Sequence, residues 1–170
     1  ARGVAASGEG GSPLTDTPPV NAILSLLQLA DHPQDTVARY HVAMTPLGAA
    51  VEYTDWRDAA AARRLSGRVR RALARDGYGA TLAGWVAGVA VRSERREDER
   101  LLQLVELGHR WDERSTLRPG DFIRYVGKEV VEDPSAARVQ VMTVHKAKGL
   151  QFDVVVLPEL QYSMADKGRG

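Results

Sequence analysis

Apolar residues recur with helical spacing in the first part of the chain. Five of them follow the i, i+3, i+4, i+7 pattern of one buried helix face: Val20, Ile23, Leu24, Leu27 and Ala30. The pair Pro18-Pro19 suits the first turn of such a helix, with Asp16 or Thr17 as its cap. We therefore expect one helix from about residue 18 to 30 and a second from about 34 to 44.

The same spacing continues over the middle of the chain. It predicts helices at about 55–76, 82–91 and 94–114, and one that begins near residue 121. The expected buried residues are Ala62, Leu65, Val69, Ala72, Leu73, Leu101, Leu104, Val105, Trp111, Phe122, Tyr125 and Val126. Gly67 costs about 1 kcal/mol relative to Ala inside a helix and could mark a break. We interpret Trp56, Trp85 and Trp111 as core residues, and residues 93–100 (SERREDER) as a solvated helix start.

The period changes from 3.6 to 2 at residues 139–144, which predicts a strand. Val154–Leu157 is apolar at every position, as in a strand of a parallel sheet that is covered on both faces. Residues 3–7 form a further short strand candidate, and turns are expected at 8–19. The expected fold class is mainly α with a small α/β part.

Composition narrows the function classes. The 170 residues have a net charge of +1, so any surface that attracts nucleic acid must be local. There is no cysteine, and the four histidines lack metal-ligand spacing, so no metal site is expected. No apolar run approaches a membrane span and no signal peptide is seen, which favours the cytoplasm without membrane contact. The chain opens without Met and closes soon after a strand pattern, so we expect a segment of a longer polypeptide.

Candidate chemistry gathers between the two C-terminal strand patterns. Thr143, His145, Lys146 and Lys148 fall at or just past the carboxyl end of the first one, where ligands collect in parallel sheets. Their side chains can all donate to phosphate oxygens, and Gly149 allows close backbone approach. The alternative is a solvated polar loop. Only about eight residues separate the two patterns, whereas adjacent parallel strands need a crossover of a dozen or more.

A family resemblance favours the phosphate interpretation. The segment VQVMTVHKAKGLQFDVVVLPEL resembles motif V of superfamily 1 helicases of the UvrD/RecB/AddA type, and the AddA/RecB helicase–nuclease branch is the most similar. Residues 1–48 are similar to the segment that leads into the helical accessory subdomain of these proteins. The resemblance implies that residues 1–14 and 138–170 belong to the second RecA-like (P-loop NTPase) domain. Residues 15–137 would form the inserted helical accessory subdomain.

The resemblance also implies roles for individual residues of this loop. Thr143 and His145, with Lys146 beside them, would lie against the backbone of the tracked single strand. Gly149 and Gln151 would lie near the phosphates and ribose of ATP. Gln151 departs from the Glu of the family pattern; its amide can still hydrogen-bond a ribose hydroxyl, but it lacks the negative charge.

The implied whole protein is an ATP-dependent, Mg²⁺-requiring DNA helicase or helicase–nuclease. It would move 3′ to 5′ on single-stranded DNA, act on forked DNA in recombinational repair and pair with a nuclease subunit. ATP hydrolysis needs a phosphate-binding loop G-x-x-x-x-G-K-[ST], and none is found, so this chain alone is expected to be inactive. The alternatives are a non-enzymatic helical DNA-binding or interaction module that retains a motif V remnant, and a generic nucleotide-binding α/β protein. A phosphate-binding loop encoded upstream would favour the helicase. A start codon just before Ala1 would favour the non-enzymatic module.

A second cationic feature lies in the expected third helix. Arg57, Arg64, Arg68, Arg71 and Arg75 form one stripe, with Arg63 and Arg70 further round, and no acidic residue lies between Asp58 and Asp76. This pattern fits a face that contacts the phosphates of duplex DNA. The alternative is a solvated helix face.

Overall fold

The computed structural model describes residues 6–8, 12–89, 95–114, 116, 118–131 and 139–157. It is mostly helical. The helices are α1 (Pro18–Asp31), α2 (Thr36–Ala43), α3 (Pro46–Ala50), α4 (Ala59–Val89), α5 (Arg95–Asp112), α6 (Pro119–Val126) and α7 (Val144–Ala147), preceded by the 3-10 turn η1 (Leu14–Asp16). The strands are β1 (Ala6–Gly8), β2 (Ser12–Pro13), β3 (Val130–Val131) and β4 (Val139–Val141).

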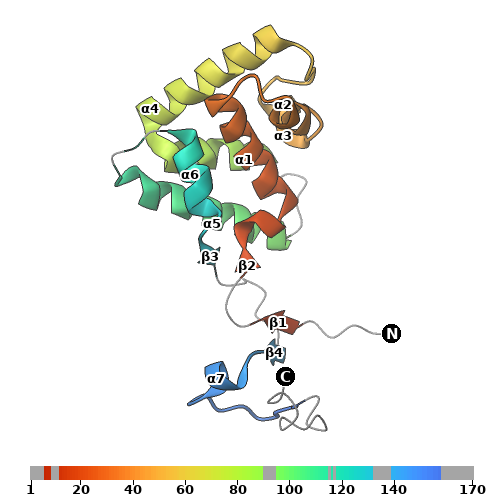
Figure 1. Cartoon of the computed structure of the whole chain (residues 1–170), viewed down its shortest axis with the longest axis vertical. Coiled ribbons are helices and arrows are strands. Elements are labelled where there is room, and N and C mark those ends of the chain that lie inside the picture. The colour runs from red at the N-terminus through yellow and green to blue at the C-terminus, as the bar shows by residue number, and fades with distance from the viewer. Residues whose placement is uncertain are drawn as a thin grey trace, which may run out of the picture.

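Helices α1 to α6 form one block, here called the helical block, with α1 at its centre (Figure 1). Helix α1 contacts α2, α4, α5 and α6. Its buried residues exceed the predicted stripe and cover most of the helix surface: Val20, Ala22, Ile23, Leu24, Leu26, Leu27, Leu29 and Ala30. One polar, half-buried side remains, formed by Asn21, Ser25 and Gln28, so the helix packs against neighbours over most of its circumference. Thr17 occupies the predicted cap position, although its hydroxyl bonds Asp16 rather than the helix backbone.

The long helix α4 covers the two helices predicted at about 55–76 and 82–91, and a kink at Gly77 divides it close to the predicted boundary. It is continuous through Gly67, so the break expected there is wrong. The chain departs from helical geometry at Gly77 instead, where φ is +81°. The carboxylate of Asp112, on α5, accepts hydrogen bonds from the backbone N–H groups of Tyr78 and Gly79 at 2.6 and 2.9 Å. These two N–H groups follow the kink, and Asp112 satisfies them as a cap would.

An aromatic cluster joins α4, α5 and α6. The ring of Phe122 lies 4.7 Å from that of Tyr78 and 5.8 Å from that of Trp111, and Tyr125 stacks on Trp111 at 5.0 Å. Trp111 is buried as predicted, while Trp56 and Trp85 are half-buried against the core. The prediction that residues 93–100 form a solvated helix start is wrong at Arg100. Its side chain is fully buried and donates a hydrogen bond to the side chain of Gln103 at 3.1 Å.

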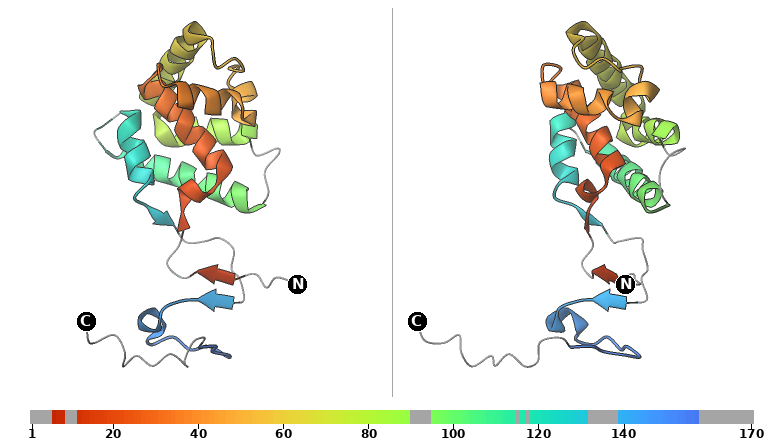
Figure 2. Two further views of the ribbon diagram at one scale, coloured as in Figure 1. Left: turned by 45° about the vertical axis from the view of Figure 1, so that its right-hand side comes forward. Right: turned by 90° about the vertical axis from the view of Figure 1, so that its right-hand side faces the viewer.

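The strands form two small pairs outside the helices (Figures 1 and 2). Strands β2 and β3 pair antiparallel beside the helical block, and β1 and β4 pair in parallel beyond them. The predicted strand at residues 3–7 overlaps β1, whose first described residue is Ala6. The mainly α prediction is confirmed. The expected RecA-like parallel sheet is not seen among the described residues, where the only parallel pairing is that of β1 with β4.

Candidate nucleic-acid interface

The candidate loop, residues 143–151, begins just past the carboxyl end of β4. Strand β4 pairs with β1 in the register Ala6 to Val139 and Gly8 to Val141. Because the two strands are parallel, their carboxyl ends lie at one edge, and the loop leaves from that edge. The structure therefore places Thr143 where the sequence predicts it, although β4 ends at Val141, earlier than expected.

The first half of the loop is a single helical turn rather than the irregular loop that the sequence predicts. The backbone N–H of Ala147 donates to the carbonyl of Thr143 at 3.0 Å and closes α7. Gly149 ends the turn with φ at +89°, and the N–H of Leu150 bonds the carbonyl of Ala147 at 3.0 Å. A glycine with positive φ just after a helix is a common stop signal, and the Lys148-Gly149 pair could have indicated the turn.

The predicted phosphate donors fall on this one short segment. Thr143, His145 and Lys148 are exposed, and Lys146 occupies the turn next to His145. No ion pair to His145 or Lys148 is found within the described part of the chain. These two side chains are therefore available to an outside anion. A backbone phosphate of nucleic acid is one such anion, because it accepts hydrogen bonds from hydroxyl, imidazole and ammonium groups alike.

The second half of the loop holds the two residues expected near ATP. A Cβ placed on Gly149 would meet no atom within 4 Å, so the backbone there is open to close approach. Gln151 is exposed two residues later. Both positions are therefore accessible to a ligand. Among the described residues no cluster of three or more His, Asp or Glu side chains could hold a metal ion.

The predicted covered strand at Val154–Leu157 is wrong for this structure. These residues have no strand pairing, and the side chains of Val154 and Val156 are 79% and 80% exposed. A strand buried on both faces needs a layer on each side. No described part of this chain supplies either layer.

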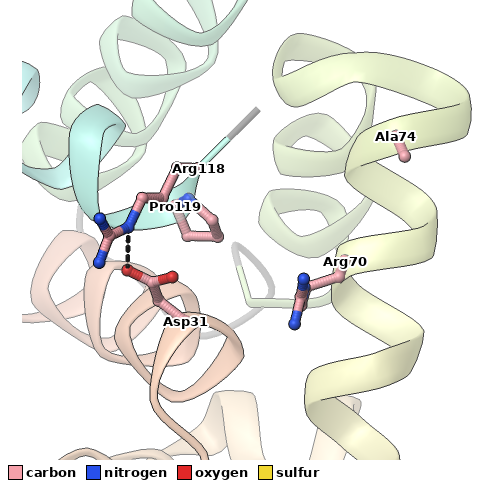
Figure 3. Close-up of a pocket in the computed structure, with 5 residues that line it drawn as sticks. All are labelled: Asp31, Arg70, Ala74, Arg118 and Pro119. Atoms are coloured by element: carbon pink, nitrogen blue, oxygen red, sulfur yellow. Dashed lines mark hydrogen bonds and ion pairs between the residues drawn. The ribbon is translucent and has the colours of Figure 1, made fainter. Parts of the chain in front are cut away.

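A separate hollow of about 560 Å³ lies on the helical block, lined by Asp31, Arg70, Ala74, Arg118 and Pro119. Figure 3 shows Arg118 and Asp31 joined, with Arg70 projecting toward them from α4. The Nε–H of Arg118 donates to the Asp31 carboxylate at 3.3 Å, so the two charges largely neutralise each other. We assign no ligand to this hollow. Residues 87 positions apart form this pair, and no local sequence signal predicts it.

Comparison with known proteins supports a nucleic-acid role. Residues 20–164 match the family model of the UvrD-like helicase C-terminal domain, so the match includes both the helical block and the candidate loop. Comparisons with curated proteins and with solved structures gave no match. No described helix has the length and hydropathy that crossing a membrane requires. With most of its length matched, the chain belongs to the family of UvrD-like helicase C-terminal domains.

Proposed function

We propose that this chain is part of an ATP-dependent DNA helicase that moves 3′ to 5′ on single-stranded DNA and unwinds forked DNA in recombinational repair. The observation that carries the proposal is the position of the candidate loop. It lies inside the family match and leaves from the carboxyl edge of a parallel strand pair. An AddA-type helicase–nuclease that works with a nuclease subunit is the specific form that we propose.

Two subdomains follow from this proposal. Residues 1–14 and 138–170 belong to the second RecA-like domain, and residues 15–137 to the helical accessory subdomain inserted into it. The exposed apolar run at Val154–Leu157 supports this division, because such a run suits a sheet with further strands and helices around it. The helical block supports it as well, since its core is built from its own helices.

The candidate loop would contact both ligands of the motor. Thr143, His145, Lys146 and Lys148 bind the phosphate backbone of the single strand. Gly149 and Gln151 contact ATP, whose hydrolysis with Mg²⁺ supplies the free energy for movement. The two sets are adjacent in sequence, so a change at the nucleotide can alter the grip on DNA through one short turn. That is a direct physical route for coupling free energy between two sites.

The test is binding of labelled single-stranded DNA, followed by fluorescence anisotropy at a low and a high salt concentration. The wild-type chain is compared with His145→Ala/Lys146→Ala and with a control, His32→Ala/Lys128→Ala, which removes the same side-chain types from the helical block. We expect salt-sensitive binding that the loop variant loses and the control keeps, because phosphate contacts release counterions. Equal binding by the loop variant would exclude the loop as a DNA contact.

A further inference from the structure

The outer side of α2 has a row of exposed apolar side chains that the proposed function does not use. Val37, Tyr40 and Met44, the C-cap of the helix, are 77%, 53% and 54% exposed. Their spacing places them in one line along a helix, and the row spans about 10 Å at the 1.5 Å rise per residue. Helix α2 contacts α1 and α3, and its buried residues, which include Ala38 and Val42, lie on the other side.

Such a row is uncommon on the helical block. Among the described residues of the block, the other large apolar residue that is exposed is Leu102 on α5, at 63%. Single exposed apolar residues are normal on a protein surface, whereas contiguous ones mark an interaction site. Leu102 therefore needs no explanation, while the row on α2 does.

The ring of Trp56 extends this row. It lies 5.8 Å from the ring of Tyr40 in an edge-on arrangement and is half-buried against the core. The hydroxyl of Tyr53 donates to the carbonyl of Trp56 at 3.3 Å and accepts from the Nε–H of the buried Arg39 at 3.2 Å. Because these bonds already order the loop, little conformational entropy is lost there when a partner binds. The name apolar patch is used here for four residues: Val37, Tyr40, Met44 and Trp56.

The patch has a positive edge at Arg57. This residue, which the sequence assigns to the arginine stripe, lies before α4, with its guanidinium 4.4 Å above the ring of Trp56. It has no ion pair within the part of the chain that the structure describes. The neighbouring carboxylates of Asp35, Asp55 and Asp58 instead accept hydrogen bonds from backbone N–H groups. Arg57 is therefore the charge beside the patch that is available to a carboxylate from outside.

We propose that the apolar patch binds a short amphipathic helix of a partner protein, with apolar side chains in one row and carboxylates beside it. A row of about 10 Å matches two turns of such a helix, which would contact it through residues spaced by three, four or seven positions. Tyrosine, tryptophan, methionine and arginine are the residue types enriched in protein interfaces, and the patch with Arg57 combines all four. The carboxylate of the partner would pair with Arg57.

The size of the patch favours a single helix over a second copy of this chain. Stable contacts between globular proteins bury about 800 Å² on each partner. An aromatic side chain buries at most about 150–250 Å², and Tyr40 and Trp56 are already partly covered. Four residues therefore fall short of a stable dimer interface, but they are enough to hold one face of a short helix.

The probes for the test are two labelled synthetic helices of about four turns. Both have leucines in one row, which glutamates flank in the first and lysines in the second. Binding to the whole chain is followed by fluorescence anisotropy. We expect the acidic helix to bind about tenfold more tightly, because Arg57 attracts the glutamates and repels the lysines. Tyr40→Ser/Met44→Ser should weaken both helices at least about tenfold, as the loss of central interface residues does. Leu102→Ser, the control on α5, should bind like the wild type.

The charge at the edge of the patch is tested separately. Arg57→Gln should weaken the acidic helix about threefold, within the range of a solvent-exposed ion pair, and bind the basic helix no more weakly than the wild type. Arg110→Gln, an exposed arginine at the far end of α5, is the matched control and should change neither affinity. All the substituted side chains are exposed, so the urea midpoints of these variants should equal that of the wild type.

Several results would overturn the proposal: no binding of either helix, equal binding of both, or unchanged binding by Tyr40→Ser/Met44→Ser. Self-association in sedimentation equilibrium that this variant abolishes would assign the patch to a second copy instead. The loop variant His145→Ala/Lys146→Ala separates this proposal from the proposed function. It should lose single-stranded DNA and bind both helices like the wild type, so each surface can fail without the other.

Discussion

Similar apolar residues are buried in the helical block and exposed in the strand segment, which comprises β1, β4 and residues 142–157. In the block, Ile23, Leu27 and Leu29 are fully buried in a core made by the surrounding helices. In the strand segment, Val141, Val144 and Val156 are 63%, 74% and 80% exposed. Burial of one such side chain is worth about 1.5–3 kcal/mol. The block gains this free energy within the chain, whereas the strand segment needs a partner layer to gain it.

The largest expected effect comes from emptying the core of the block. Phe122 is fully buried and its ring contacts those of Tyr78, Trp111 and Tyr125. Phe122→Ala should lower the free energy of unfolding by about 3–5 kcal/mol, because it leaves a cavity that the cluster cannot close. Val156→Ala, at an exposed position, should change it by less than about 0.5 kcal/mol. Urea denaturation followed by circular dichroism measures both.

A large loss of stability in Val156→Ala would contradict the comparison. It would mean that residues 154–157 bury their side chains in solution. A small loss in Phe122→Ala would mean that the aromatic cluster is loosely packed.

The same contrast explains what could be predicted from the sequence. Helices α1, α2, α5 and α6 were predictable because their apolar spacing repeats within each helix, and residues such as Leu27 and Phe122 lie on the expected faces. The short helix α3 was missed because five residues hold too little periodic signal. The prediction of a buried strand at 154–157 was wrong because burial there depends on neighbouring layers, which the local sequence pattern does not encode.

Glycines show the limit of local information most clearly. Gly67 and Gly77 both lie in the segment that forms α4. The sequence pattern indicated a possible break at Gly67 and also ended one predicted helix at residue 76, next to Gly77. Only Gly77 takes positive φ, because Asp112, 35 positions later, bonds the backbone that follows it. For the candidate loop, the sequence predicted the position of Thr143 and His145 past a strand end. It did not predict the helical turn α7.

A smaller effect is expected from substituting two glycines of similar conformation, one in the helical block and one in the strand segment. Gly77 has φ of +81° and Gly149 has φ of +89°, so an L side chain is strained at both. At Gly77 a Cβ would also lie 2.9 Å from the carboxylate of Asp112. Gly77→Ala should lower the free energy of unfolding by about 1–3 kcal/mol, since the kink is tied to the core. Gly149→Ala should leave global unfolding unchanged, because only the exposed turn α7 depends on it.

Thermal or urea unfolding distinguishes these variants, and Gly84→Ala is the matched control. Gly84 lies inside α4 with no atom within 4 Å of its Cβ position, so alanine there should stabilise by about 0.5–1 kcal/mol. If Gly149→Ala destabilises the protein as much as Gly77→Ala, the strand segment unfolds together with the block, and the two regions are one cooperative unit.

The smallest effect concerns a helix cap inside the block and depends on pH. The carboxylate of Asp35 accepts from the backbone N–H groups of Val37 and Ala38, both at 3.0 Å, and these bonds, that from Ala38 foremost, lower its pKa from the ordinary value. A lowered folded-state pKa contributes stability above the unfolded-state pKa, which is lost as the pH falls through the folded-state value. Asp35→Ala should therefore cost about 1 kcal/mol at neutral pH. The difference in the free energy of unfolding between the variant and the wild type should become smaller at pH values below the ordinary pKa of an aspartate. Urea titrations of both proteins at several pH values measure this, and a difference that stays constant on acidification would show that the charge of Asp35 does not stabilise α2.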